Sequence, residues 1–158
     1  MKALTKNVLA AVAILASTAG VAVAQNEKDR GAIEAVLETY ETALNTSDTA
    51  TVITLYTEDG VFMPQHSLPN VGTDAVRAAY ENVFHAIKLD VVFEIDEIAQ
   101  IAPDWAFVRT RSQGFVTISA TGARMPEGNQ ELFVFNKTGS GDWKIARYIF
   151  STTNPPRQ

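Results

Sequence analysis

Four side chains in this sequence have types and positions suited to acid–base or anion chemistry: His66, Arg109, Arg111 and Glu131. His66 comes two residues after Pro64, where an apolar segment runs into a loop that precedes a helix. An imidazole at the mouth of a pocket titrates near neutral pH and can serve as a general base. A solvated surface histidine is the alternative interpretation, and the sequence leaves both open.

The two arginines alternate with smaller residues along the segment 105–113. Side chains of a strand alternate between its faces, so one face carries both arginines together with Trp105 and Phe107. Because this face also bears large aromatic rings, we predict that it points inward, from the core into a polar cavity. Arg109 and Arg111 would then form a clamp for a carboxylate or another anion.

Glu131 lies in a second predicted strand, in phase with Phe133 and Phe135. We therefore predict that it faces the same cavity and pairs with one of the two arginines. A guanidinium beside Glu131 would lower the pKa of its carboxyl and hold it ionised. A purely structural pair between neighbouring strands at the rim is the alternative to a ligand clamp.

Several other chemistries lack their motifs. The chain has no cysteine, so it forms no disulfide and carries no thiol nucleophile. Its two histidines, His66 and His85, show no metal-ligand spacing. Ser140 lies in a glycine-rich turn without the context of a nucleophile elbow, and no glycine-rich cofactor loop is present. We predict neither a metal nor a cofactor.

The first 24 residues are predicted to be a secretory signal peptide. Lys2 and Lys6 precede an apolar run, and Ala22-Val23-Ala24 is a cleavage signal. The remainder, residues 25–158, suits one domain exported to the periplasm or the medium. Loss of the two lysines changes the formal net charge from −5 to −7. An acidic chain without a basic run is not expected to bind nucleic acid, nor a membrane after cleavage.

Hydrophobic periodicity predicts helices first and strands afterwards. Apolar residues recur at helical spacing over 27–45 and again from Thr73 to Ile87, and Asp48 is a predicted N-cap for a short helix between them. After Lys88 the period changes to two, and further strands are predicted over 105–118, 130–137 and 143–151, with a loop at 121–129. This order predicts an α+β fold in which a curved, mainly antiparallel sheet wraps around three helices.

These elements resemble the nuclear transport factor 2-like superfamily, also called ketosteroid-isomerase-like or SnoaL-like. The resemblance rests on five segments: YETALNTSD at 40–48, LYTEDG at 55–60, GTDAVR at 72–77, ELFVF at 131–135 and WKIARY at 143–148. The last two segments are most similar to the branch called SgcJ/EcaC. The resemblance implies a cone-shaped barrel and a homodimer. Fold alone does not assign the chemistry, because this superfamily contains both enzymes and binding modules.

Isomerases of this fold pair a tyrosine with a protonated carboxylic acid, which the resemblance places at Tyr40 and Glu131. The resemblance places Pro64 where the isomerase carries its base. Glu58 and Asp59 lie earlier, in a predicted turn between helix and strand.

Two hypotheses follow from these residues. The first is an exported small-molecule-binding protein with a conical pocket, whose further ligand-binding residues are Tyr56, Phe62, Phe84, Arg109, Arg111 and Phe150. The second is a cofactor-independent isomerase or lyase that uses His66 as base and Tyr40 or an arginine to stabilise an oxyanion.

Overall fold

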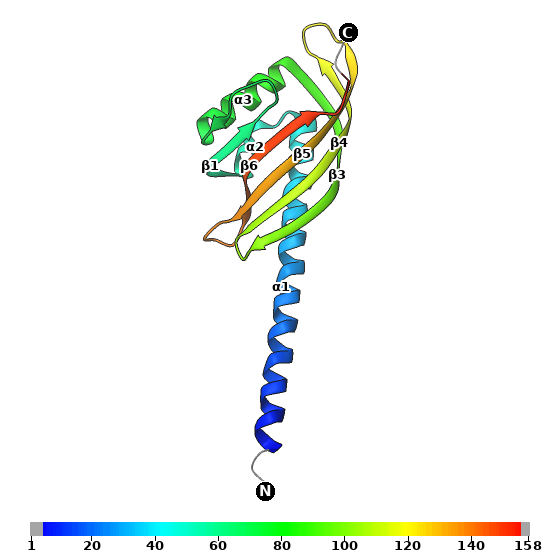
Figure 1. The fold of residues 1–158 in the computed structure, drawn as a ribbon. Coiled ribbons are helices and arrows are strands. Elements are labelled where there is room, and N and C mark those ends of the chain that lie inside the picture. Colours follow the sequence, from blue (N-terminus) through cyan, green and yellow to red (C-terminus); the bar gives the residue numbers. More distant parts are fainter. Residues whose placement is uncertain (1–4, 156–158) are drawn as a thin grey trace.

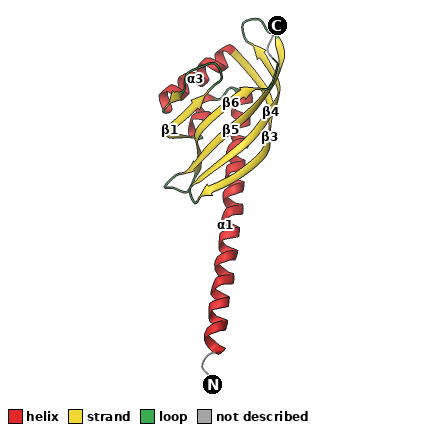
Figure 2. Cartoon of the chain, viewed as in Figure 1, coloured by secondary structure: helices red, strands yellow, loops and turns green. Residues whose placement is uncertain are grey.

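The computed structural model describes residues 5–155 of the chain, with side chains from residue 26 onward. In this part of the chain three helices occur: α1 (Thr5–Thr46), α2 (Thr49–Thr54) and α3 (Thr73–Ala86). The strands are β1 (Tyr56–Met63), β2 (Asn70–Val71), β3 (Ile87–Ala102), β4 (Trp105–Ile118), β5 (Arg124–Lys137) and β6 (Trp143–Thr152). They form one sheet in the order β2-β1-β6-β5-β4-β3 (Figure 1, Figure 2).

The predicted α+β class is confirmed, and the sheet is mixed. β1 runs parallel to β6, whereas β3, β4, β5 and β6 pair antiparallel in sequence order. Residues of α1, α2 and α3 share one buried cluster with side chains of the inner face of the sheet. The core therefore lies between the helices and that face, and the opposite face of the sheet is its outer face.

The predicted stripe of α1 is buried through Ile33, Leu37, Tyr40 and Leu44. After α1 the chain turns at Ser47, which has a φ of 56°, and Asp48 caps α2 as predicted. The Asp48 carboxylate accepts a hydrogen bond from the backbone N–H of Thr51 at 3.0 Å. Helix α3 begins at Thr73, also as predicted. Local polarity and helical spacing were thus sufficient to place the buried stripe of α1 and the starts of α2 and α3, whereas α1 itself begins earlier, at Thr5.

The predicted strand over 105–118 coincides with β4, but the predicted loop at 121–129 is wrong. β5 begins at Arg124, which pairs with Thr117 across a short turn. Gly122 has a φ of 71° in this turn, a conformation that glycine adopts without strain. Pro126 and Gly128, two residues typical of loops, are accommodated inside the antiparallel ladder.

Glu58 and Asp59 were predicted in a turn between helix and strand, whereas they lie within β1. The pairing of β1 with β6 shifts register between Tyr56 and Val61, so both acids occupy an irregular part of the strand and are exposed. Asp59 pairs with Arg147 at 3.4 Å. Glu58 and Asp59 therefore face solvent, and neither lines the cavity described below.

The predicted signal peptide, residues 1–24, lies outside the residues whose side chains the structure describes. Within residues 26–155 no helix combines the length and the apolar character needed to cross a membrane.

Candidate functional site

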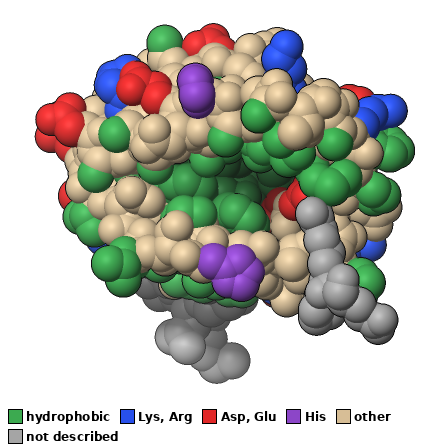
Figure 3. Space-filling model, turned by 90° about the horizontal axis from the view of Figure 1, so that it is seen from above, with side chains coloured by type: hydrophobic (Ala, Val, Ile, Leu, Met, Phe, Trp, Pro, Cys, Tyr) green, Lys and Arg blue, Asp and Glu red, His purple; other side chains and the backbone are tan. Residues whose placement is uncertain are grey.

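A cavity of about 160 Å³ lies between α1, α3 and the inner face of the sheet. Seen from above, it opens as a hollow with a largely hydrophobic wall (Figure 3). The aromatic part of the wall consists of Tyr40, Phe62, Tyr80, Phe93, Tyr148 and Phe150. A concave, mainly apolar site with a few polar groups is the usual form of a small-molecule pocket.

The aromatic rings of the wall are held in fixed orientations by one another. Phe62 stacks on Tyr80 with ring centroids 4.6 Å apart and on Tyr148 at 5.7 Å. Tyr148 in turn stacks on Phe133 at 4.1 Å and on Phe150 at 5.8 Å. Because neighbouring rings support each ring, the wall presents a rigid surface to a planar ligand.

Three buried tyrosines form a hydrogen-bonded chain beside the cavity. Tyr80 Oη lies 2.6 Å from Tyr40 Oη and 2.9 Å from Tyr56 Oη. Three hydroxyl protons serve two hydrogen bonds, so one proton is left for another acceptor. Tyr40 lines the cavity, whereas Tyr56 does not. When Tyr56 donates to Tyr80 and Tyr80 donates to Tyr40, the remaining proton lies on Tyr40.

Burial raises the pKa of each of these three tyrosines well above its usual value. The hydroxyl groups therefore stay protonated at neutral pH. With Tyr80 donating to it, Tyr40 can donate a hydrogen bond to an oxygen in the cavity.

Glu131, on β5, is the buried carboxyl of the cavity, with 6% of its surface exposed. It accepts a hydrogen bond from Thr110 Oγ1 and another from Ser112 Oγ at 2.6 Å. None of the ion pairs among the described residues includes Glu131. Burial raises its pKa, and the hydrogen bonds from the two hydroxyls offset only part of that effect. Glu131 thus favours its protonated form more than an exposed glutamate does.

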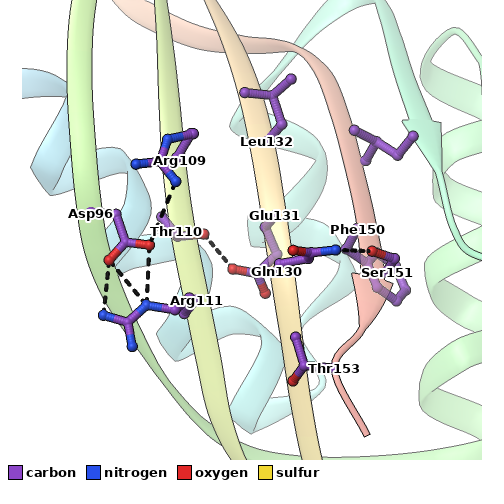
Figure 4. A pocket seen from close by; sticks show the side chains of 11 residues that line it. Asp96, Arg109, Thr110, Arg111, Gln130, Glu131, Leu132, Phe150, Ser151 and Thr153 are labelled. Atoms are coloured by element: carbon purple, nitrogen blue, oxygen red, sulfur yellow. Dashed lines mark hydrogen bonds and ion pairs between the residues drawn. The ribbon is translucent and has the colours of Figure 1, made fainter. Parts of the chain in front are cut away.

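The prediction that Arg109 and Arg111 face the cavity is wrong. Their side chains are 54% and 45% exposed on the outer face of the sheet. Arg109 Nε donates to Glu97 at 2.7 Å. Arg111 Nη2 donates to Asp96 at 2.9 Å, a pair that Figure 4 shows, so both arginines have acids of β3 as partners. The inner face of β4 carries Ala106, Val108, Thr110 and Ser112, each at most 2% exposed.

Alternation along β4 defines two faces, but it does not say which one is inside. The small residues of β4 fit beneath the bulky rings of α1, β5 and β6, and the guanidinium groups are solvated and paired with acids outside. The predicted pair between Glu131 and Arg109 or Arg111 is therefore wrong as well, and so is the anion clamp inside the cavity.

The polar wall of the cavity includes three residues that the sequence did not single out: Ser112, Glu127 and Asn129. Asn129 Nδ2 donates to Ser112 Oγ at 3.4 Å. Glu127 and Asn129 fell in the loop that was predicted at 121–129. A correct start for β5 would have placed them on the face that Glu131 shares, because side chains two residues apart in a strand point the same way.

Other predicted site residues divide into two groups. Tyr40, Phe62 and Phe150 line the cavity, as the hypothesis of a pocket requires. Phe84 packs on Tyr80 at 5.8 Å between ring centroids but does not line it. Three further aromatic residues line the cavity without having been proposed as ligand-binding residues: Tyr80, Phe93 and Tyr148.

His66 is exposed, has a φ of 62° and is not among the residues that line the cavity. Histidine side chains are visible on the rim around the hollow (Figure 3). The structure therefore does not bring His66 to the buried polar wall. Among the described residues no three His, Asp or Glu side chains gather as a metal site.

The fold and the cavity belong to a known class. The SnoaL-like domain model matches residues 36–151, and the chain belongs to this family. This confirms the predicted superfamily, and the narrower SgcJ/EcaC branch stays a prediction. No curated protein matches the chain in sequence.

Three crystal structures illustrate the similarity. A ketosteroid isomerase-like protein from Erwinia carotovora atroseptica SCRI1043 is 41% identical with a TM-score of 0.76, over 79% of this chain and 96% of that chain. A conserved protein from Planctomyces limnophilus DSM 3776 is 25% identical with a TM-score of 0.70, over 80% and 98%. An uncharacterized protein with a cystatin-like fold from Caulobacter vibrioides is 21% identical with a TM-score of 0.66, over 80% and 90%, and shares the fold.

Proposed function

We propose that this protein binds a small uncharged molecule in the cavity between its helices and the sheet, which forms the base of a conical pocket. One observation carries the proposal: a largely aromatic cavity contains a buried carboxyl, Glu131, whose hydrogen-bond partners are hydroxyl groups. None of the described lysines, arginines or histidines lines the cavity. A negatively charged ligand would meet no opposite charge there, and burying it would be costly.

The polar groups of the cavity suit a ligand that carries an oxygen acceptor. Tyr40 is the cavity-lining end of the tyrosine chain, and it can donate a proton to a ligand when Tyr80 donates to it. Glu131 in its protonated form is a second donor. The resemblance pairs these two positions, and the raised pKa of Glu131 supports the pairing. A carbonyl or phenolic oxygen is the group that two such donors bind best.

The test is mass spectrometry of small molecules that co-purify with the native protein. Leu89 lines the cavity, and Leu89→Trp would fill it. Val92 lies on the opposite face of the same strand and is 67% exposed, so Val92→Trp is the matched control. We expect a molecule to co-purify with the wild type and with Val92→Trp but not with Leu89→Trp. A molecule retained equally by all three would lie outside the cavity.

A second candidate function is a cofactor-independent isomerase or lyase. The observation that favours it is the match to the ketosteroid isomerase-like protein, together with Tyr40 and Glu131 at the cavity wall. His66 does not line the cavity, so the carboxylate available to move a proton is Glu127, on the same wall. A base there would remove a proton from the carbon between a carbonyl and a double bond. The proton would then return at the far carbon of the dienolate.

This activity can be measured with a single-ring ketone, 3-cyclohexenone, whose conjugated product absorbs in the ultraviolet. Accelerated isomerisation that is lost in Glu127→Gln would support the second candidate over simple binding. An isomerisation rate equal to that in buffer alone would contradict the isomerase hypothesis. We expect no turnover of a β,γ-unsaturated ketosteroid, because Pro64 replaces the base at the position that the resemblance indicates.

Export is proposed on the pattern of the first 24 residues, with cleavage before Gln25. Sequencing the N-terminus of the exported protein, from periplasm or medium, tests it. An intact Met1 would overturn the proposal.

We also propose a homodimer that forms through the outer face of the sheet. Leu132 and Ile149 are 39% and 44% exposed there, beside a shallow groove that Arg109 and Arg111 also line (Figure 4). Light scattering during size-exclusion chromatography measures the oligomeric state. Ile149→Glu should give a monomer, and a wild-type monomer at all concentrations would contradict the proposal.

A further inference from the structure

We propose that Glu127, at the rim of the cavity, repels anions and thereby restricts the ligand to a single-ring molecule without an anionic group. The inference rests on the proposed function, because it names the chemical class of ligand for the same cavity. It depends on three observations: the volume of the cavity, the position of Glu127, and the lack of a described cation that would neutralise this carboxylate.

The volume limits the ligand to about one ring. The cavity measures about 160 Å³. An apolar cavity of about 150 Å³ in another protein binds benzene. The stacked rings of Phe62, Tyr148 and Phe150 offer flat surfaces against which one aromatic or unsaturated ring packs. In so small a space, the substituents of the ring lie close to the polar part of the wall.

The strand register turns the side chain of Glu127 toward the cavity. β4 and β5 pair in one continuous register without a shift. Glu127 precedes Glu131 by four residues on β5, and side chains an even number of residues apart in a strand share a face. Both residues line the cavity. Glu127 and Glu131 therefore project from the inner face of the same strand, at two different levels.

Of these two levels, that of Glu127 is where the cavity meets the surface. Glu127 is half-buried, whereas Glu131 is buried. Glu127 also lines a shallow depression on the surface, together with Gly114 and Asn154. Gly114 is its partner on β4, and a side chain at this position would collide with the backbone carbonyl of Asp90. The space beside Glu127 thus stays open, and Glu127 stands at the rim of the cavity.

The charge of the Glu127 carboxylate has no opposite charge beside it. None of the ion pairs among the described residues includes Glu127. A ligand anion would meet this negative charge in a site where apolar rings exclude much of the water, and repulsion between like charges is stronger there than in bulk water. An uncharged ring meets no such cost. Glu127 is therefore a specificity-determining residue.

The experiment is a fluorine NMR titration at neutral pH and low salt with three single-ring probes: para-fluorophenol, para-fluorobenzamide and para-fluorobenzoate. The benzamide and the benzoate have nearly the same shape, and only the benzoate is charged. We expect the wild type to bind both uncharged probes, and to bind the benzoate at least about tenfold more weakly than the benzamide. In Glu127→Gln this ratio should fall about fivefold, as the loss of one nearby charge in a partly solvated site predicts. In Glu127→Lys it should fall further.

Glu58→Gln is the matched control, because it removes the same charge from an exposed glutamate of β1 that does not line the cavity. It should keep the wild-type ratio. If Glu127→Gln lacks a native circular dichroism spectrum, Glu127→Ser replaces it. A ratio that Glu127→Gln leaves unchanged, or that Glu58→Gln lowers equally, would overturn the inference and leave the proposed function standing. Failure of both uncharged probes to bind the wild type would overturn the two together.

Discussion

Two buried carboxyls on opposite sides of the core have different partners. Asp29 of α1 is 3% exposed, and its carboxylate accepts a hydrogen bond from Lys137 Nζ at 2.7 Å. Glu131 is 6% exposed, and its partners are the hydroxyls of Thr110 and Ser112. Lys137 and Glu131 belong to the same strand, β5, about 20 Å apart along it.

The difference separates a structural role from a binding role. At Asp29 the charge is paired with a cation, and the pair ties α1 to the end of β5 beside the indole of Trp143. At Glu131 burial works against ionisation, and the group faces a cavity. A protein that needs Glu131 only for stability would gain from an apolar residue there. A buried carboxyl without a cation at the cavity wall therefore favours a role toward a ligand.

The largest expected effect comes from removing the cation of the first pair. Lys137→Met would leave Asp29 buried without its ammonium partner, and breaking a buried pair costs on the order of 3–5 kcal/mol. Urea unfolding measures the loss. Changing Asp29 to Asn in the same protein should recover part of it. Arg124→Met removes an exposed pair with Asp90 and should cost only about 0–1 kcal/mol. Equal losses in the two variants would contradict the buried character of the Asp29 pair.

The second-largest loss of stability is expected from a substitution in the tyrosine chain. Tyr80→Phe removes the hydroxyl that joins Tyr40 to Tyr56, and it leaves two buried hydroxyls short of a partner. We expect a loss of about 1–3 kcal/mol in the free energy of unfolding. Tyr56→Phe removes only the end of the chain and should cost less. If Tyr56→Phe costs more, then Tyr56 rather than Tyr80 is the central member of the chain.

In contrast to Lys137→Met, Glu131→Gln should not lower the free energy of unfolding by several kcal/mol. Since none of the described cations pairs with Glu131, we expect the free energy of unfolding at neutral pH to change by less than about 1 kcal/mol or to rise. A loss of several kcal/mol would show that a cation does pair with this carboxyl.

The pH dependence sharpens this prediction. The pKa of Glu131 is raised in the folded protein, so its contribution to stability is fully present below the pKa of the unfolded chain. The contribution is lost as pH rises through the folded pKa. The stability of Glu131→Gln should therefore fall less than that of the wild type as pH rises through this range. Urea midpoints at several pH values measure it, and parallel pH curves would contradict the assignment.

The smallest effect is expected at Arg111. Its side chain is 45% exposed and pairs with Asp96 on the outer face, so Arg111→Met should leave the binding of cavity probes unchanged. Titration of para-fluorophenol into this variant measures it. A large loss of affinity would restore an anion-binding role for the arginines.

By itself the sequence determined the class of fold and the positions of most elements. Helical spacing along 27–45 placed the buried stripe of α1, the side chain of Asp48 placed the start of α2, and alternation placed β4 at its observed bounds. The family resemblance paired Tyr40 with Glu131, and both line the cavity. These features depend on local periodicity, on capping and on short segments, all of which are read directly from neighbouring residues.

Only the tertiary structure decided which face of β4 points inward, and with it the chemistry of the cavity. The segment 105–113 alternates large and small side chains, and both orientations satisfy that pattern. The orientation is settled by volumes and partners on other elements: aromatic rings of α1 and β6 leave room only for Thr110 and Ser112, and acids of β3 receive the arginines outside. Only the tertiary structure also decided that Asn129 lies at the cavity wall, because its position depends on where β5 begins to pair with β4. Such information lies in contacts between residues distant in sequence, so no local pattern contains it.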